Sequence, residues 1–319
     1  MGSQEWQLYQ KLELLVLKGS LKGEVIEAES GNLPTSNLPK YKVGDGLIVA
    51  YSQDLEGNRV FYITDYIRRN SLLWLFAIFL IISLLIGRWQ GLTSLIGLAI
   101  SFLVIFKFIL PQIYNGADPV QIAILASLVI IPVTFLLSHG LNKKTGVAIA
   151  GTLAALILTG ILANLFVNLS QLTGFASEEA GFLQAYKPGL INMKGLLLAG
   201  IIIGVLGILD DITISQAAIV DQLKKANPKL RLKELYKKAM NVGRDHIASM
   251  INTLILVYTG AALPLLLLFI NNPSPFSQVI NYEIIADEVV RTLVGSIGLI
   301  LAVPITTLIA AWAVDKNRA

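Results

Sequence analysis

Residues 195–214 read GLLLAGIIIGVLGILDDITI, an apolar run that carries two adjacent carboxylates, Asp210 and Asp211, near its end. A helix needs about 20 apolar residues to cross a bilayer core of about 30 Å. With its continuation to Val220, this run is long enough. It therefore predicts a membrane-spanning helix with two ionisable groups inside it.

Further apolar stretches of similar length lie on both sides of this one. The composition agrees, because 55% of the residues are hydrophobic and only 14% are charged, with a mean hydropathy of +0.68. A soluble domain carries about 25% charged residues. We expect an all-α polytopic membrane bundle of about seven transmembrane helices, occupying residues 71–314 and surrounded by the lipid bilayer. The expected spans are 71–87, 92–110, 119–138, 146–169, 195–220, 247–270 and 286–314.

Several classes of chemistry are excluded. The chain has no Cys, and its two His residues, His139 and His246, are far apart in the sequence. Disulfides, Cys-ligated metals and thiol catalysis are therefore excluded. We expect no metal and no cofactor. The sequence has no Walker A, HExxH or GxSxG pattern, so we predict no catalytic residues and no enzyme. The net charge of +4 arises from basic residues gathered in one loop, which indicates membrane topology rather than binding to nucleic acid.

Residues 21–66 have a different pattern from the rest. Short β-branched runs, 23–28, 46–51 and 59–64, alternate with turn residues, and Asp54–Asn58 is typical of a hairpin loop. We expect a small β-rich domain of three to five strands, preceded by an N-terminal tail over residues 1–20. Two interpretations of this domain stay open, a spacer without a ligand and a module that binds an external partner.

The distribution of Lys and Arg predicts the orientation, because short cytoplasmic loops are enriched in both. Eight basic residues lie in the loop between spans 195–220 and 247–270. The loops on the other side of the membrane, 111–118, 171–190 and 271–285, contain one basic residue, Lys187. We expect a bacterial plasma-membrane protein with a cytoplasmic C-terminus and an extracytoplasmic N-terminal domain. Residues 1–20 are too short and polar for an export signal, so we also expect a hydrophobic segment upstream. The basic loop between spans 195–220 and 247–270 contains Lys224, Lys225, Lys229, Arg231, Lys233, Lys237, Lys238 and Arg244.

The carboxylate pair is the first candidate site. Gly200, Gly204, Gly207, Asp211 and Ser215 recur every three or four residues and so share one helix face. The glycines predict close helix packing. Asp211 should then point into that contact, with Asp210 about 100° round the helix. Ionisable groups inside a membrane mark proton or ion pathways, so both are proton-relay candidates. The alternative is a helix that ends early and leaves both carboxylates at the cytoplasmic interface.

A second candidate region begins at the basic loop and continues into span 247–270. Arg244 and Asp245 are further relay candidates, since Arg244 can pair with Asp210 or Asp211. The alternative is that Arg244 only anchors the helix at the headgroups. We expect a polar seam that is either hydrated or held by interhelical hydrogen bonds. Its members are Ser215, Asn241, His246, Ser249, Asn252 and Thr253.

Two family resemblances follow from local motifs. The chain from about residue 20 resembles the YibE/YibF family of bacterial membrane proteins, which are described as permeases. The motifs are YKVGD (41–45), ITDY (63–66), HGLNKK (139–144), MNVGRD (240–245) and LVGSIGL (293–299).

Residues 204–262 are similar, more distantly, to the centre of SecD/SecF and the RND (resistance–nodulation–division) transporters. The similarity lies in GILDDITI (207–214), DQLKK (221–225) and the Ser249-x-x-Asn-Thr253 pattern. It implies a six-helix unit over residues 90–314 with an intramembrane Asp as proton relay. The large outer domain of those transporters is reduced here to residues 111–118.

These observations lead to three hypotheses. The first is a proton-coupled transporter or proton-driven motor for a substrate that the sequence does not name. We expect it to work as a homodimer or with a paralogous membrane partner. The second is a membrane scaffold or sensor whose β-domain binds an external partner. The third, an intramembrane hydrolase, requires two carboxylates that face each other from separate elements.

Overall fold

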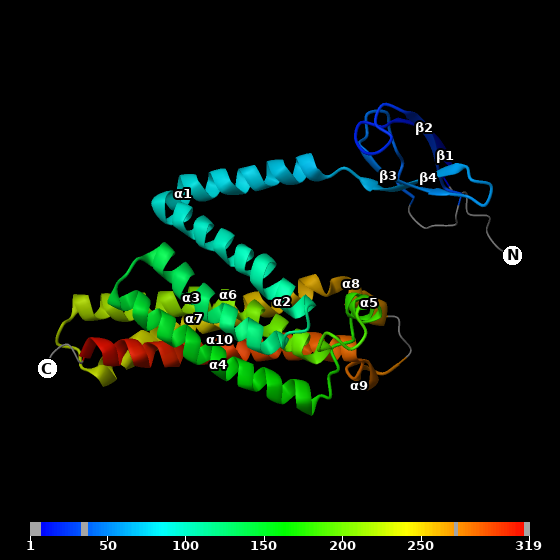
Figure 1. The fold of residues 1–319 in the computed structure, drawn as a ribbon. Coiled ribbons are helices and arrows are strands. Elements are labelled where there is room, and N and C mark those ends of the chain that lie inside the picture. Colours follow the sequence, from blue (N-terminus) through cyan, green and yellow to red (C-terminus); the bar gives the residue numbers. More distant parts are fainter. Residues whose placement is uncertain (1–7, 33–37, 271–273, 316–319) are drawn as a thin grey trace. The chain divides into compact units, whose positions relative to one another are not determined.

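The computed structural model describes residues 8–32, 38–270 and 274–315 and divides the chain into two compact units, Met1–Ile82 and Ser83–Ala319 (Figure 1). Each unit is considered separately below. The first contains all the described strands, and the second contains the helical bundle.

The first unit is built from two antiparallel hairpins, β1–β2 and β3–β4, with Ile26 and Ala28 buried in its interior. The predicted hairpin loop is confirmed: Asp54 Oδ1 accepts hydrogen bonds from the backbone N–H of Glu56 and Asn58. These bonds, that from Asn58 above all, hold the pKa of Asp54 below its ordinary value. Within the described residues the hairpins are separate two-stranded sheets and form no closed barrel. The strands are β1 (Gln10–Leu15), β2 (Val25–Ser30), β3 (Leu47–Gln53) and β4 (Arg59–Tyr66).

β1 falls in the segment that the sequence assigned to an N-terminal tail. Its residues alternate between half-buried and exposed, which is the pattern of a strand with one covered face. Residues 10–15 of the expected tail therefore belong to a hairpin.

The first two expected spans lie in one continuous helical segment, Arg69–Tyr114. It comprises α1 (Arg69–Val104), the π-helix η1 (Ile105–Ile109) and α2 (Leu110–Tyr114). Arg88 has non-helical backbone angles (φ 49°, ψ −130°), so the chain turns sharply where the sequence predicted a loop.

Three long helices, α4 (Lys143–Leu169), α6 (Met193–Ala226) and α10 (Glu283–Asp315), form the centre of the bundle. α3 (Pro119–His139) packs against α6 and α4. The side chains of Asp118, Asn142 and Asn192 cap the N-termini of α3, α4 and α6 by accepting a backbone N–H. α6 lies at the middle of this arrangement and touches α3, α4, α7 and α10 (Figure 1).

α7 (Leu232–Ala261) continues after a 68° bend into α8 (Leu263–Ile270), and both cover the expected span 247–270. Short helices α5 (Glu178–Tyr186) and α9 (Phe276–Val279) complete the described chain. By helix length and hydropathy, this is a multi-pass membrane protein with five candidate spans, or six if α7 and α8 form one broken span. Seven were expected. Arg69–Tyr114 counts as one helical segment instead of two spans, and the bent α7–α8 pair accounts for the difference between five and six.

Candidate functional site

Asp210 and Asp211 lie near the middle of α6, which continues as a helix to Ala226. The alternative in which the helix ends early is therefore wrong. Asp210 is half-buried, and its Oδ1 atom is fully buried and receives no hydrogen bond from any described residue. Asp211 is exposed on the surface of the bundle. The two carboxylates thus occupy different environments. Asp210 is the more buried of the two, whereas the sequence predicted that Asp211 would be.

The expected close packing at the glycine face is not present within the chain. Gly200, Gly204 and Gly207 are exposed. Among the described residues, and apart from the adjoining residues and backbone of α6 itself, no heavy atom lies within 4 Å of a Cβ built on Gly200 or Gly207. On Gly204 the nearest atom is the Tyr258 hydroxyl, at 3.9 Å. The face of α6 that carries the glycines and Asp211 therefore borders open space, while the opposite faces of α6 are buried.

The candidates on α7 lie mostly on its exposed side. Arg244 makes no ion pair with Asp210 or Asp211 in the described structure. Thr253 Oγ1 donates to the Ser249 carbonyl, a bond inside the helix that leaves the polar face uncovered. The members of the predicted seam divide by exposure: Asn241, Arg244, Asp245, Ser249, Asn252 and Thr253 are exposed, and Ser215 and His246 are half-buried.

A buried polar network that the sequence did not single out joins the central helices. Gln216 is completely buried on α6, and its Nε2 donates to Thr307 Oγ1 at 2.7 Å and to the Ala239 carbonyl at 3.1 Å. Thr152 and Thr213 share a hydrogen bond of 2.6 Å between α4 and α6. The one feature of the sequence that could have indicated this network is a Gln inside the span, Gln216, five residues after the Asp pair. Its partners come from distant helices and cannot be read from spacing.

The first turns of α10 hold a second group of charges, which the sequence analysis did not single out. Glu283 accepts hydrogen bonds from Thr173 and from the Gly174 backbone. Asp287 is buried with an unpartnered Oδ1, and Glu288 lies 4.0 Å from Arg291. The sequence signal was the clustering of acidic residues one turn before Arg291.

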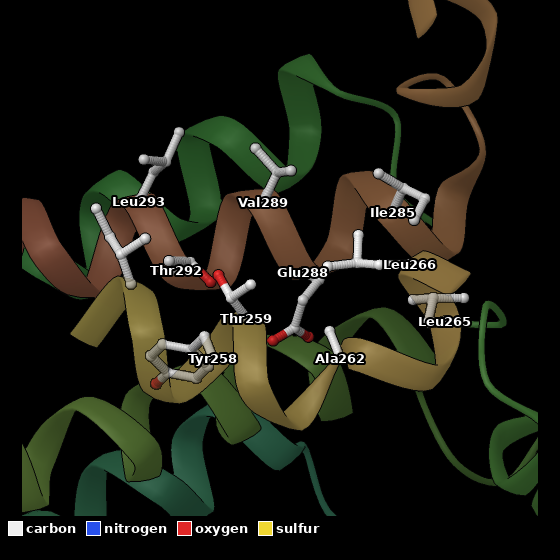
Figure 2. A pocket seen from close by; sticks show the side chains of 11 residues that line it. Tyr258, Thr259, Ala262, Leu265, Leu266, Ile285, Glu288, Val289, Thr292 and Leu293 are labelled. Carbon is white, nitrogen blue, oxygen red and sulfur yellow. The ribbon is translucent and has the colours of Figure 1, made fainter. Parts of the chain in front are cut away.

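Glu288 lines a cavity of about 230 Å³ between the α7–α8 bend and α10. In Figure 2 its carboxylate points from α10 toward α7, and the hydroxyl-bearing Thr259 and Thr292 line the same cavity. The other labelled side chains are mainly apolar. The cavity therefore offers a small polar patch in an apolar cleft.

The region around the Asp pair combines three features. Asp210 is half-buried with one buried, unpartnered oxygen atom, Asp211 beside it is exposed, and α7 exposes a polar side. In the part of the chain that the structure describes, no group of three or more His, Cys, Asp and Glu side chains is placed to hold a metal ion.

The family model of YibE/F-like proteins matches residues 75–316. This chain belongs to the YibE/F family. The match includes most of α1 and every other helix of the bundle, and it confirms the first resemblance over residues 75–316. The motifs at 41–45 and 63–66 lie outside it. No curated protein and no solved structure matches this YibE/F chain. The resemblance to SecD/SecF and the RND transporters accordingly has no support from the comparisons.

Proposed function

We propose that this YibE/F protein is a proton-coupled membrane transporter in which Asp210 and Asp211 take up and release the proton. The observation that carries the proposal is the buried Oδ1 of Asp210, which no described residue satisfies. An unpaired carboxylate inside a membrane helix is costly, and binding a proton relieves that cost. Proton uptake then favours one helix arrangement over another, in proportion to the difference in proton affinity between them.

The position of the pair supports transport rather than hydrolysis. Adjacent residues on one helix point about 100° apart, so Asp210 and Asp211 do not flank a single scissile bond from opposite sides. Asp210 is half-buried and Asp211 is exposed. This arrangement suits transfer of a proton between the interior of the bundle and its surface. We therefore propose a non-enzymatic role.

The proposal includes an RND-like six-helix unit over residues 90–314. Its helices would be the part of α1 after Arg88, then α3, α4, α6, α7–α8 and α10. Arg244 and Asp245 would extend the pathway toward the start of α7. It also includes the orientation inferred from the basic loop, with the β-hairpins outside a bacterial plasma membrane.

Infrared difference spectroscopy tests the proposal without a known substrate. Acidifying the reconstituted wild type should give a protonated-carboxyl band at the high frequency typical of a weakly hydrogen-bonded group. Asp210→Asn should abolish that band, and Asp211→Asn should shift or reduce it. Asp221→Asn is the matched control, because Asp221 is on the same helix but already pairs with Lys225 at 2.7 Å. Spectra of Asp210→Asn and Asp211→Asn that match the wild type would rule out the relay.

A scaffold or sensor is the second candidate, and the separate N-terminal unit favours it. Residues 1–82 form a compact unit, and Val43 and Leu55 on it are fully exposed apolar side chains. Exposed apolar side chains of this kind suit contact with a partner protein. A missing carboxyl signal in the infrared experiment, with loss of cellular function on deletion of residues 1–66, would favour this role.

A further inference from the structure

α6 exposes a narrow strip on the surface of the bundle, made of Gly200, Gly204, Gly207 and Asp211. α3 packs against α6, and α7 contacts it at Gly204 through Tyr258. A glycine strip is suited to close approach by another helix. The carboxylate in the same strip makes lipid an unfavourable neighbour.

α7 exposes polar side chains at the same depth in the bundle as Asp211 of α6. Tyr258 lies against Gly204, and Gln216 lies against Gly243, so α6 and α7 run antiparallel with a fixed register. Asp211, between Gly204 and Gln216, is therefore level with the part of α7 between Gly243 and Tyr258. That part contains the exposed Ser249, Asn252 and Thr253. An exposed carboxylate and exposed hydrogen-bond donors thus occur at one level of the bundle.

We infer that this exposed face of α6 and α7 is the interface between two copies of the chain, joined around a two-fold axis. Two copies insert in the same direction, so the axis runs along the membrane normal and preserves depth. Asp211 of one copy then meets the level of Ser249, Asn252 and Thr253 in the other. The Asp211 carboxylate of one copy then faces the exposed polar side chains of α7 in the other copy, among them the amide donor of Asn252.

The middle of the described α3 and α4 does not offer this chemistry. Its outward side chains include Ile124, Leu128, Ile157 and Ile161, which provide no donor for a carboxylate. The helical segment 72–82 is likewise apolar throughout. The inference rests on exposure, register and charge, and it holds whether or not the protein transports protons.

Disulfide trapping in membrane vesicles tests the interface directly, because the full chain has no native Cys. Vesicles that contain both Gly207→Cys and Thr253→Cys copies should give a covalent dimer as the main product of mild oxidation, because the proposed axis places α6 of one copy against α7 of the other. The space around Gly207 accepts the new side chain. Ile161→Cys, on the exposed face of α4, is the matched control and should stay monomeric.

Two results would overturn the inference. One is dimer formation by the mixed Gly207→Cys and Thr253→Cys copies that is no greater than dimer formation by Ile161→Cys. The other is an intrachain disulfide in the double variant Gly207→Cys/Phe79→Cys, which would place α1 over the strip instead.

The oligomeric state of the protein in nanodiscs gives a second readout. The wild type should be a dimer, and Gly207→Leu should be a monomer because a bulky side chain blocks the helix approach. Gly160→Leu is the control, since Gly160 on α4 also has open space around it among the described residues. A monomeric wild type, or equal dimer fractions in the two variants, would contradict the interface.

Discussion

At the scale of single residues, the bundle depends on glycine–threonine contacts between its central helices. A Cβ on Gly298 of α10 would lie closer than 3.0 Å to the side chain of Thr159 on α4, and Gly151 of α4 is in the same situation against Thr306 of α10. Real Cβ atoms essentially never approach so closely. These glycines are therefore required by packing, whereas those at 200, 204 and 207 are free of such contacts in the described chain.

This contrast gives a stability prediction. Gly298→Ala should destabilise the protein by about 1–3 kcal/mol, because an extra methyl group overfills a packed site. Gly160→Ala should be neutral or stabilising by up to about 1 kcal/mol, because Ala has the higher helix propensity and meets no neighbour. Heating the purified variants and measuring the remaining monodisperse fraction by size-exclusion chromatography gives a thermal midpoint for each, which should fall for Gly298→Ala and not for Gly160→Ala. Equal thermal midpoints would show that the α4–α10 contact tolerates a methyl group.

At the scale of elements, α6 organises the structure because it combines apolar packing with polar links to its neighbours. Gln216 connects it to α7 and α10, and Thr213 connects it to α4. In a membrane the helices gain little from hydrophobic association, so such hydrogen bonds and close packing carry more of the specificity. The Asp pair lies directly beside these links, which ties its surroundings to the positions of three other helices.

A double-mutant cycle measures one of these links. Gln216→Met keeps the side-chain volume similar but removes both hydrogen bonds, and Thr307→Val removes the hydroxyl that Gln216 contacts. Interhelical hydrogen bonds of this type average about 0.6 kcal/mol, with a maximum near 1.7 kcal/mol. We expect a coupling energy in that range from reversible unfolding of the four variants. Strictly additive effects would mean that the 2.7 Å contact contributes nothing to stability.

Local sequence patterns predict most of these elements because each depends on nearby residues. The lengths of the apolar stretches locate α3, α4, α6 and α10, and the Asp54–Asn58 turn locates the β3–β4 hairpin. Periodicity also places Gly200, Gly204, Gly207 and Asp211 on one face. Which neighbour covers that face depends on tertiary packing, so the prediction that Asp211 is buried was wrong. The partners of Gln216 and the burial of Asp287 depend on distant helices for the same reason.

At the scale of the whole molecule, the number of crossings decides which side of the membrane the β-hairpins occupy. The segment Arg69–Tyr114 is 46 residues long, which corresponds to about 69 Å of helix, more than twice the bilayer core of about 30 Å. Arg88 divides it with non-helical angles, and a charged residue at this point suits a membrane surface. We therefore expect this segment to cross the membrane twice, although it counts as one continuous helical segment.

Cysteine accessibility in intact cells separates the two arrangements, and the absence of native Cys removes background labelling. If the segment crosses twice, three crossings separate Asn58 from Lys143, so Asn58→Cys and Lys143→Cys should react with an impermeant maleimide from opposite sides. Trp89→Cys, beside the turn, should then react from the same side as Lys143→Cys and Lys229→Cys. We expect the Lys143 side to be cytoplasmic, because the basic residues concentrate there. If the segment crosses once, Asn58 and Lys143 share a side. Labelling of both positions from the cytoplasm would therefore refute both the double crossing and the external location of the β-hairpins.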